Sequence, residues 1–327
     1  KKILWQYPSE QFAYMAQRVL EKSGLTLIRN ALALTGDRNV ALAGGVFSNI
    51  KLNMKVAELP ETKHVFVFPH MGDGGLAVGA GIEVNHRKFG IHQYPLRDLS
   101  LGPGFSDEDM LTSLKSRGFP HSRLNDAAGR AAELVLDGEI VFWFQRRMEI
   151  GPRALGNRSI LGRPDRREIK DRLNLVLKKR VWYQPFCPTI LSSDADSLLY
   201  LNGQDIRDNR FMTMAFRVRE AYQPLMEGVT NIDGTCRPHF VGDENPLYRD
   251  LLLNVKKELG MGVVLNTSFN IHGEPMVCTP DDALDMFSRT RVKYLFLGDF
   301  LVTKGLRVAS DELRVKHRNT KGRSLEK

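Results

Sequence analysis

The sequence predicts an α/β protein made of two domains, and three observations support this prediction. The chain has 327 residues, which is long for a single domain. Before residue 90, the order of strand, glycine-rich loop and helix occurs twice, as in α/β nucleotide-binding lobes. A stretch rich in glycine and proline, 90–104, then separates this lobe from further strands and helices.

Hydrophobic spacing predicts the elements of the first lobe. Apolar residues three and four positions apart indicate helices, and short apolar runs that end in glycine or proline indicate strands. In chain order we expect a helix at 9–34, a strand at 39–43, a helix through 50–56, a strand at 64–68 and a small-residue helix around 80–81.

The second domain is expected to be mixed α/β. Ser106 and Thr279 are each followed three residues later by an aspartate, which is a signature of a helix start. The other expected elements are strands at 139–145, 211–218, 262–266 and 294–302 and helices at 165–179 and 246–259.

Composition narrows the class of protein. Hydrophobic residues make up 42% and charged residues 26%, as in ordinary soluble domains. The sequence lacks a run of about 18 apolar residues and a signal segment, so we expect a cytoplasmic protein without membrane contact. Because Lys1 stands where an initiator methionine is usual, we expect a portion of a longer chain. Cys187, Cys236 and Cys278 are far apart, which favours reduced thiols over a zinc site or disulfides.

Basic residues cluster in the second domain. Residues 146–180 carry twelve Lys or Arg and four acids, interleaved with glycine, proline and hydrophobic residues. This pattern favours a folded pocket for a compact anion such as a polyphosphate. It does not favour nucleic acid, for which the sequence shows no binding motif. A second basic segment, 306–327, is interpreted as a solvated tail without an assigned function.

Polar clusters of the second domain predict the residues of this pocket. The longest, 145–159, alternates arginines with glycine and proline, so that guanidinium forks can reach phosphate oxygens. A solvated turn would explain the arginines but not their place between buried segments. The predicted site residues are Arg147, Gly151, Arg153, Arg158, Lys178, Lys179, Arg180, Asp233, Thr235, Arg237, Asn266, Thr267, Ser268 and Asn270.

The first lobe offers weaker signals. Gly44 and Gly45 follow a strand and let the backbone approach a ligand, and Asn49 lies where it can contact a nucleotide. Asp73 stands among glycines at a strand end and is a candidate metal ligand. A plain turn and a helix cap are the alternatives, and for Asp73 chemistry alone favours the cap.

These motifs resemble the O-carbamoyltransferases that modify nodulation factors and antibiotics. Segments 147–159, 185–188, 233–237 and 266–270 resemble their C-terminal domain, and 44–49 and 72–75 resemble the end of their N-terminal domain. The resemblance implies four regions of the chain: a partial actin-like ATPase lobe at 1–95, a linker at 96–104, a mixed α/β domain resembling threonylcarbamoyl-adenylate synthase at 105–305 and a tail at 306–327.

The resemblance also implies a reaction. In this family the C-terminal domain combines carbamoyl phosphate and ATP into carbamoyl adenylate. The N-terminal domain then transfers the carbamoyl group to a hydroxyl of a small-molecule acceptor beside a divalent metal, Fe or Mg. The residues carried over are Arg153, Lys179 and Arg237 at phosphate-binding positions, Ser268 at the adenylate site, Asp73 as a metal ligand, and Gly45 and Asn49 as nucleotide contacts.

The chain also departs from the family pattern. The family's histidine pair with HxxxH spacing is absent, so we expect this chain alone not to hold the metal. Arg146 and Ile150 replace a usual Gly and Phe, and segment 180–184 lacks one Glu and one Arg. These changes leave open which lysine binds phosphate. The alternatives are hydrogenase-maturation-type carbamoyl transfer to cysteine and a tRNA-modification or nucleotide-binding module, and a homodimer is compatible with each.

Overall fold

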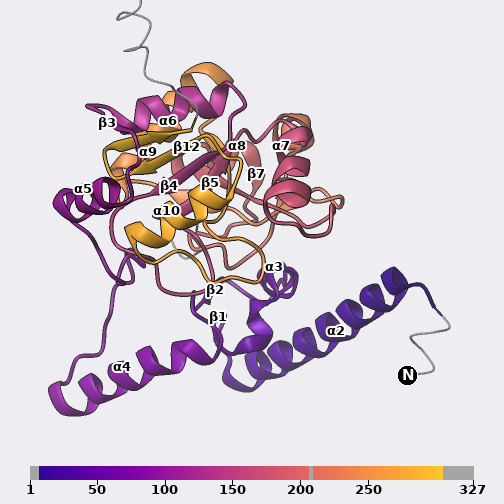
Figure 1. Cartoon of the computed structure of the whole chain (residues 1–327). Coiled ribbons are helices and arrows are strands. Elements are labelled where there is room, and N and C mark those ends of the chain that lie inside the picture. The colour runs from indigo at the N-terminus through magenta and orange to yellow at the C-terminus, as the bar shows by residue number, and fades with distance from the viewer. Residues whose placement is uncertain (1–6, 206–208, 305–327) are drawn as a thin grey trace, which may run out of the picture.

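The computed structural model describes residues 7–205 and 209–304, and the predicted basic tail at 306–327 lies outside the described residues. Eight strands of the C-terminal part form one sheet (Figure 1). They are β3 (His121–Arg123), β4 (Val141–Phe144), β5 (Arg158–Gly162), β6 (Cys187–Leu191), β10 (His239–Val241), β11 (Val263–Ser268), β12 (Tyr294–Leu297) and β13 (Phe300–Thr303).

The strand order is β10-β6-β11-β5-β4-β12-β13-β3. Pairing is parallel between β10 and β6 and between β4 and β12, and antiparallel elsewhere in this sheet. The predicted mixed α/β character of the C-terminal part is therefore confirmed.

Helices cover both faces of this sheet. α6 (Ala127–Leu136) and α9 (Pro246–Leu259) share an apolar cluster with Val141 and Trp143 of β4. α5 (Asp107–Ser116) and α10 (Pro280–Arg289) share the opposite cluster with Phe142 and Phe144. Alternate side chains of β4 thus point to opposite faces, and all four are 0% exposed, as expected for a strand covered on both sides.

Shorter elements connect one edge of the sheet to the rest of the chain. They are α7 (Arg167–Asp171), the π-helical turn η3 (Arg172–Leu177), η4 (Ser192–Asp194), α8 (Ala195–Leu198), η5 (Glu220–Tyr222), η6 (Pro224–Met226) and a three-stranded antiparallel sheet of β7 (Leu199–Tyr200), β8 (Phe216–Val218) and β9 (Thr235–Cys236).

The N-terminal part has the predicted order of elements. They are α2 (Ser9–Thr35), β1 (Asn39–Leu42), η1 (Gly45–Ser48), α3 (Ile50–Ala57), β2 (His64–Val67), η2 (Asp73–Gly75) and α4 (Leu76–Phe89). β1 and β2 form a parallel pair. Figure 1 shows α2 and α4 extending at the end of the molecule opposite α6, while α3 lies next to the C-terminal part. No helix or strand occurs between Phe89 and Asp107.

Several sequence expectations need correction. The run 294–302 is a hairpin of β12 and β13 rather than one strand, because Gly298 adopts a φ of 58° and reverses the chain. Within 211–218 only β8 is a strand, and the 165–179 helix becomes π-helical after Asp171. Sequence reasoning missed α6, α8, β3, β5, β6, β7, β9 and β10. The helix starts at Ser106 and Thr279 are confirmed, each with a complete capping box.

Across the two described stretches, 7–205 and 209–304, none of the helices combines the length and apolarity that a membrane crossing requires.

Candidate functional site

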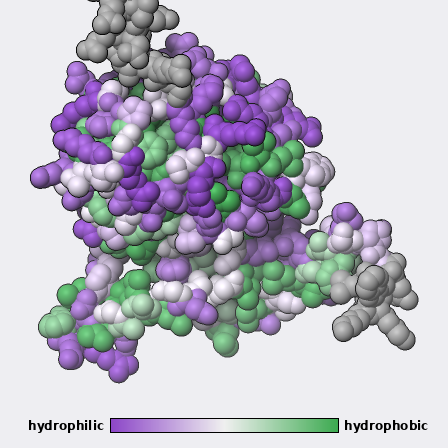
Figure 2. Space-filling view, in the orientation of Figure 1, coloured by the Kyte–Doolittle hydropathy of each residue, from purple (hydrophilic) through white to green (hydrophobic). Residues whose placement is uncertain are grey.

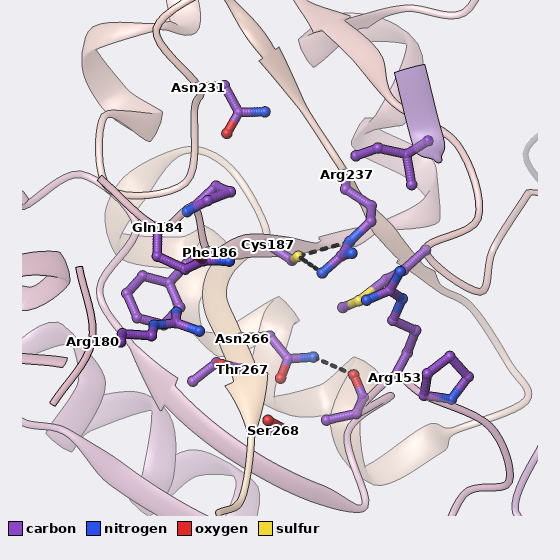
Figure 3. Close-up of a pocket in the computed structure, with 15 residues that line it drawn as sticks. Arg153, Arg180, Gln184, Phe186, Cys187, Asn231, Arg237, Asn266, Thr267 and Ser268 are labelled. Carbon is purple, nitrogen blue, oxygen red and sulfur yellow. Dashed lines mark hydrogen bonds between the residues drawn. The ribbon is translucent and has the colours of Figure 1, made fainter. Parts of the chain in front are cut away.

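A cavity of about 230 Å³ lies where the ends of β6 and β11 meet α3 and the loop before β5 (Figure 3). We call it the arginine pocket. The residues that line it are Ile50, Pro152, Arg153, Ala154, Arg180, Gln184, Pro185, Phe186, Cys187, Met212, Asn231, Arg237, Asn266, Thr267 and Ser268. Its lining includes three arginines and no carboxylate, so within the described chain it is built for an anion.

The loop that presents Arg153 is fixed from within. Glu149 is buried, and its Oε1 accepts backbone N–H bonds from Leu155 at 2.7 Å, Asn157 at 2.7 Å and Arg158 at 3.2 Å. Gly156 has a φ of 93°, and a Cβ at this position would overlap the ring of Tyr248. These contacts hold the loop in the conformation that places Arg153 at the cavity.

The three guanidinium groups lie on different sides of the arginine pocket. In Figure 3, Arg153 and Arg237 stand on one side and Arg180 on the other. Burial first, and the nearby positive Arg237 second, lower the pKa of Arg153 to about 10. Burial also lowers the pKa of Arg180. Both groups stay charged near pH 7, so the pocket concentrates positive charge that only an anion relieves.

Two of these arginines have donors with no protein partner. Nε of Arg153 and one terminal nitrogen of Arg180 are buried and form no hydrogen bond within residues 7–205 and 209–304. Arg180 is otherwise held by a 2.7 Å bond from Nε to Asn174 and by stacking at 4.5 Å over Phe186. Buried N–H groups without an acceptor are unfavourable, and a ligand oxygen would satisfy them.

Cys187 brings a thiol into the same pocket. Its Sγ accepts hydrogen bonds from two nitrogens of Arg237, at 3.1 and 2.9 Å, which fixes the direction of that guanidinium group. Sequence reasoning did not select Gln184, Phe186, Cys187 or Asn231 as site residues. For Phe186 and Cys187 the available signal was the segment 185–188, which resembles a family motif, but the motif alone does not tell which of its side chains faces a ligand.

Asn266, Thr267 and Ser268 reach the arginine pocket from the end of β11. Asn266 Nδ2 donates to the carbonyl of Ala154 at 3.1 Å and to Thr189 Oγ1 at 2.9 Å. These bonds tie β11 to the loop that carries Arg153. The structure thus brings together six of the predicted residues: Arg153, Arg180, Arg237, Asn266, Thr267 and Ser268.

The two lysines of the motif lie outside the arginine pocket. Lys178 is buried, and its Nζ donates to the carbonyl and side-chain oxygens of Ser268 and Asn270. Burial lowers the pKa of Lys178 to about 7, and the nearby positive Arg180 contributes. Lys179 is exposed and adopts a φ of 50°. In the described structure Lys178 thus holds the Ser268–Asn270 segment in place through these hydrogen bonds. Phosphate binding by either lysine stays a prediction.

Two predicted arginines donate hydrogen bonds to backbone carbonyls instead of facing the cavity. Arg158 is 0% exposed, donates to the carbonyls of Gln145 and Asn157 at 2.6 and 3.1 Å, and stacks at 3.5 Å over Phe144. Arg147 donates to the carbonyls of Leu101 and Gly102 at 2.9 and 2.8 Å. Both side chains hold the motif loop in place, and neither lines the arginine pocket.

Other predicted residues lie around this pocket without lining it themselves. Asp233 and Thr235 contact Lys51 of α3. Asn270 accepts from Ser268 Oγ at 2.6 Å, and the positive-φ turn at Gly151 lies against the Pro69 carbonyl and the His70 side chain of the N-terminal part. These residues shape the walls.

The candidate residues of the N-terminal part also fall into two groups: some line a cavity, and others have a local structural role. Gly44 and Asp73 line a second, mainly apolar cavity of about 510 Å³ between β1, β2 and α4. Asn49 caps α3 by accepting from the Leu52 N–H at 2.9 Å, and Gly45 begins η1. Among residues 7–205 and 209–304, no three His, Cys, Asp or Glu side chains gather into a metal site. The role of Asp73 as a metal ligand therefore stays a prediction, and the three cysteines are free.

Two sequence families match the chain. The family described as Carbamoyltransferase C-terminus matches residues 132–304, and the one described as Carbamoyltransferase N-terminus matches residues 3–82. The arginine pocket lies almost entirely within the first of these ranges.

Curated relatives agree with this match. Nodulation protein NolNO of Sinorhizobium fredii is 36% identical over 90% of this chain and 44% of its own length. The 3'-hydroxymethylcephem-O-carbamoyltransferase of Amycolatopsis lactamdurans is 31% identical over 79% of this chain and 47% of its own length. The chain therefore spans about half the length of the curated relatives it matches.

Among solved structures, full-length HypF in its phosphate- and nucleotide-bound form is similar at a TM-score of 0.37 and 15% identity, over 56% of this chain and 22% of that protein. At that score the likeness is too low to support an argument about function.

Proposed function

The chain belongs to the carbamoyltransferase family, and we propose that its arginine pocket forms carbamoyl adenylate from carbamoyl phosphate and ATP. The convergence of Arg153, Arg180 and Arg237 on one small cavity is the observation that carries this proposal. Three guanidinium groups suit several phosphate oxygens at once.

The reaction requires anions to approach one another. Water splits carbamoyl phosphate into carbamate and inorganic phosphate. A carbamate oxygen then bonds to the α-phosphorus of ATP as the bond to the β-phosphate breaks and pyrophosphate leaves. The unpartnered N–H groups of Arg153 and Arg180 are available to oxygens that gain charge in this step. Enclosure by Phe186 and Met212 limits the access of water to the reactive adenylate.

We extend the proposal to the whole protein. Residues 105–305 are the adenylate-forming domain, similar to threonylcarbamoyl-adenylate synthase, residues 1–95 belong to an actin-like transfer domain, and 96–104 link them. The carbamoyl group passes to a hydroxyl of a small-molecule acceptor, and AMP is released. No step is assigned to a metal, because Asp73 has too few companions in the described chain.

Product analysis tests the proposal. The purified chain is incubated with ATP and carbamoyl phosphate, and pyrophosphate and inorganic phosphate are measured together. Atom balance requires at least as much phosphate as pyrophosphate, and the pyrophosphate must depend on both substrates; phosphate that carbamoyl phosphate releases without ATP is subtracted. The control omits carbamoyl phosphate and should release neither. Formation of ADP without pyrophosphate would contradict the adenylate and indicate phosphoryl transfer instead.

A further inference from the structure

Helix α3 of the N-terminal part forms one wall of the arginine pocket. Ile50, its first residue, is among the lining residues. The carbonyl of Ile50 accepts the Ala215 N–H at 3.2 Å, and Asn53 Nδ2 donates to the carbonyl of Thr213 at 2.7 Å. Leu52 and Val56 are fully buried in the apolar cluster that also contains the core of the large sheet. The helix is therefore fixed against the C-terminal part beside Met212, another lining residue.

Lys51 extends this contact to the polar turn at 231–237. Its Nζ forms an ion pair with the Asp233 carboxylate and donates to Thr235 Oγ1 at 2.8 Å. The Lys51 side chain is 25% exposed and that of Asp233 is 50% exposed. An ion pair this open to solvent adds little to folding stability, so its role is better sought in local geometry.

The two partners of Lys51 close the turn at 231–237. Thr235 donates from its backbone N–H and its hydroxyl to Asp233 Oδ1, at 3.2 and 2.7 Å. Asn231 donates from its backbone N–H to the Thr235 carbonyl at 2.7 Å and from Nδ2 to Thr235 Oγ1 at 3.3 Å. The Thr235 hydroxyl thus donates once and accepts from Lys51 and Asn231. The turn starts at Asn231 and ends at Arg237, and both residues line the arginine pocket.

We propose that Lys51 is a positioning residue for the arginine pocket, because it holds the turn that presents Asn231 and Arg237 to the bound anion. This inference rests on the proposed anion-binding function of that pocket. It means that the anion site is completed by a helix from the N-terminal part, across the division between the two predicted domains.

The charge state of Lys51 adds a condition. Burial is the largest cause that lowers its pKa to about 8. The charged groups that face it, besides Asp233, are Arg217, Lys55, Glu21 and Glu58. Lys51 is protonated at pH 7 and becomes neutral as the pH rises through about 8, so the bond to Asp233 weakens in that range.

The test measures inorganic pyrophosphate binding by calorimetry, together with carbamoyl-phosphate-dependent pyrophosphate release, on the full chain. For Lys51→Met we expect the pyrophosphate Kd and the KM for carbamoyl phosphate to rise about tenfold, with Tm nearly unchanged. Lys51→Arg keeps the charge and should restore most of the affinity. Lys55→Met, one turn further along α3, is the matched control and should bind as the unaltered chain does.

A double-mutant cycle separates positioning from a direct contact. If Lys51 acts through the turn, Lys51→Met combined with Asp233→Asn should lose no more affinity than the worse single variant. The Kd of the unaltered chain should rise between pH 7 and 9, and that of Lys51→Arg should rise less. Unchanged binding by Lys51→Met, or losses that multiply in the double variant, would overturn the inference. A chain that binds pyrophosphate but releases none from ATP would refute the proposed reaction and leave the role of Lys51 standing.

Discussion

The large sheet and the N-terminal elements bury their apolar residues to very different degrees. Every residue of β4, β5 and β6 is buried. By contrast, Met15 and Val19 of α2 are 58% and 61% exposed, and Leu76 and Phe89 of α4 are 72% and 68% exposed. Figure 2 shows apolar residues gathered along these two helices.

The difference in burial reflects how many elements of the described chain pack against each part. A parallel pair of strands is normally covered on both faces and flanked by further strands. Among the described strands, β1 and β2 pair only with each other. Helix α3 is the exception in the N-terminal part, because its apolar residues pack into the C-terminal core. Thus the C-terminal part is a closed core that carries the arginine pocket, and the N-terminal part contributes to that pocket through α3.

The largest expected effect concerns chemistry in the C-terminal part. Arg153→Lys and Arg237→Lys should each lower carbamoyl-phosphate-dependent pyrophosphate release by roughly 10²–10³, or ~3–4 kcal/mol of transition-state stabilisation. A lysine cannot reproduce the guanidinium fork. Arg87→Lys on the exposed α4 is the control and should keep the normal rate. Near-normal rates in both pocket variants, with Tm intact, would show that these two arginines do not take part in the reaction. The reaction could then not be assigned to the arginine pocket of the C-terminal part.

The free energy of unfolding should also be more sensitive to substitution in the C-terminal part than in the N-terminal part. Gly156→Ala requires a side chain at a φ of 93° and places its Cβ against the buried Tyr248 ring. We expect a loss of ~3 kcal/mol in unfolding free energy, from backbone strain and overpacking together. Gly36→Ala, at the end of α2, has a φ of 72° but no atom near the new Cβ, so about 1 kcal/mol is expected. Denaturant unfolding of both variants measures the difference, and equal losses would show that packing around Gly156 is not decisive.

Local signals explain which elements could be predicted from sequence. The capping residues Ser106 and Thr279, and the Asn-Pro start of α9, act within one helical turn, so the sequence alone reveals them. β5 was missed because Arg158 suggests a ligand contact, whereas in the structure it is enclosed by carbonyls and by Phe144. Such enclosure depends on distant strands, which no local pattern encodes.

The same reasoning applies to the site. Arg153, Arg237 and Ser268 could be selected because glycine-bearing turns and a strand end present them. Lys51 and Cys187 could not be selected, because their importance comes from partners 182 and 50 residues away in the sequence. Charge alone also failed to distinguish Arg180, which lines the pocket, from Lys178, which supports it from behind.

A smaller effect is expected from pH. The pKa of Lys178 is lowered to about 7 in the fold, by burial first and Arg180 second, against 10.5 when unfolded. Between these values the unfolded chain binds more protons, so this group makes unfolding free energy rise with pH, by up to ~1.4 kcal/mol per unit. Lys178→Met should lack that rise. Urea unfolding at pH 7, 8 and 9 compares the two slopes, and parallel slopes would show that Lys178 keeps its ordinary pKa.

The smallest effect on stability is expected on the open face of α2. Met15→Lys and Val19→Lys replace side chains that are already mostly exposed, so unfolding free energy should change by ~0.5 kcal/mol or less. Leu114→Ala in α5 is the counterpart in the C-terminal part. Leu114 is 0% exposed, and its truncation should reduce stability by ~2–5 kcal/mol.

Because Met15 and Val19 line an apolar groove, the lysine variants should also bind less of a hydrophobic dye such as ANS. A large loss of stability in the α2 variants would mean that these side chains are covered in solution, and the contrast between the two parts would then vanish.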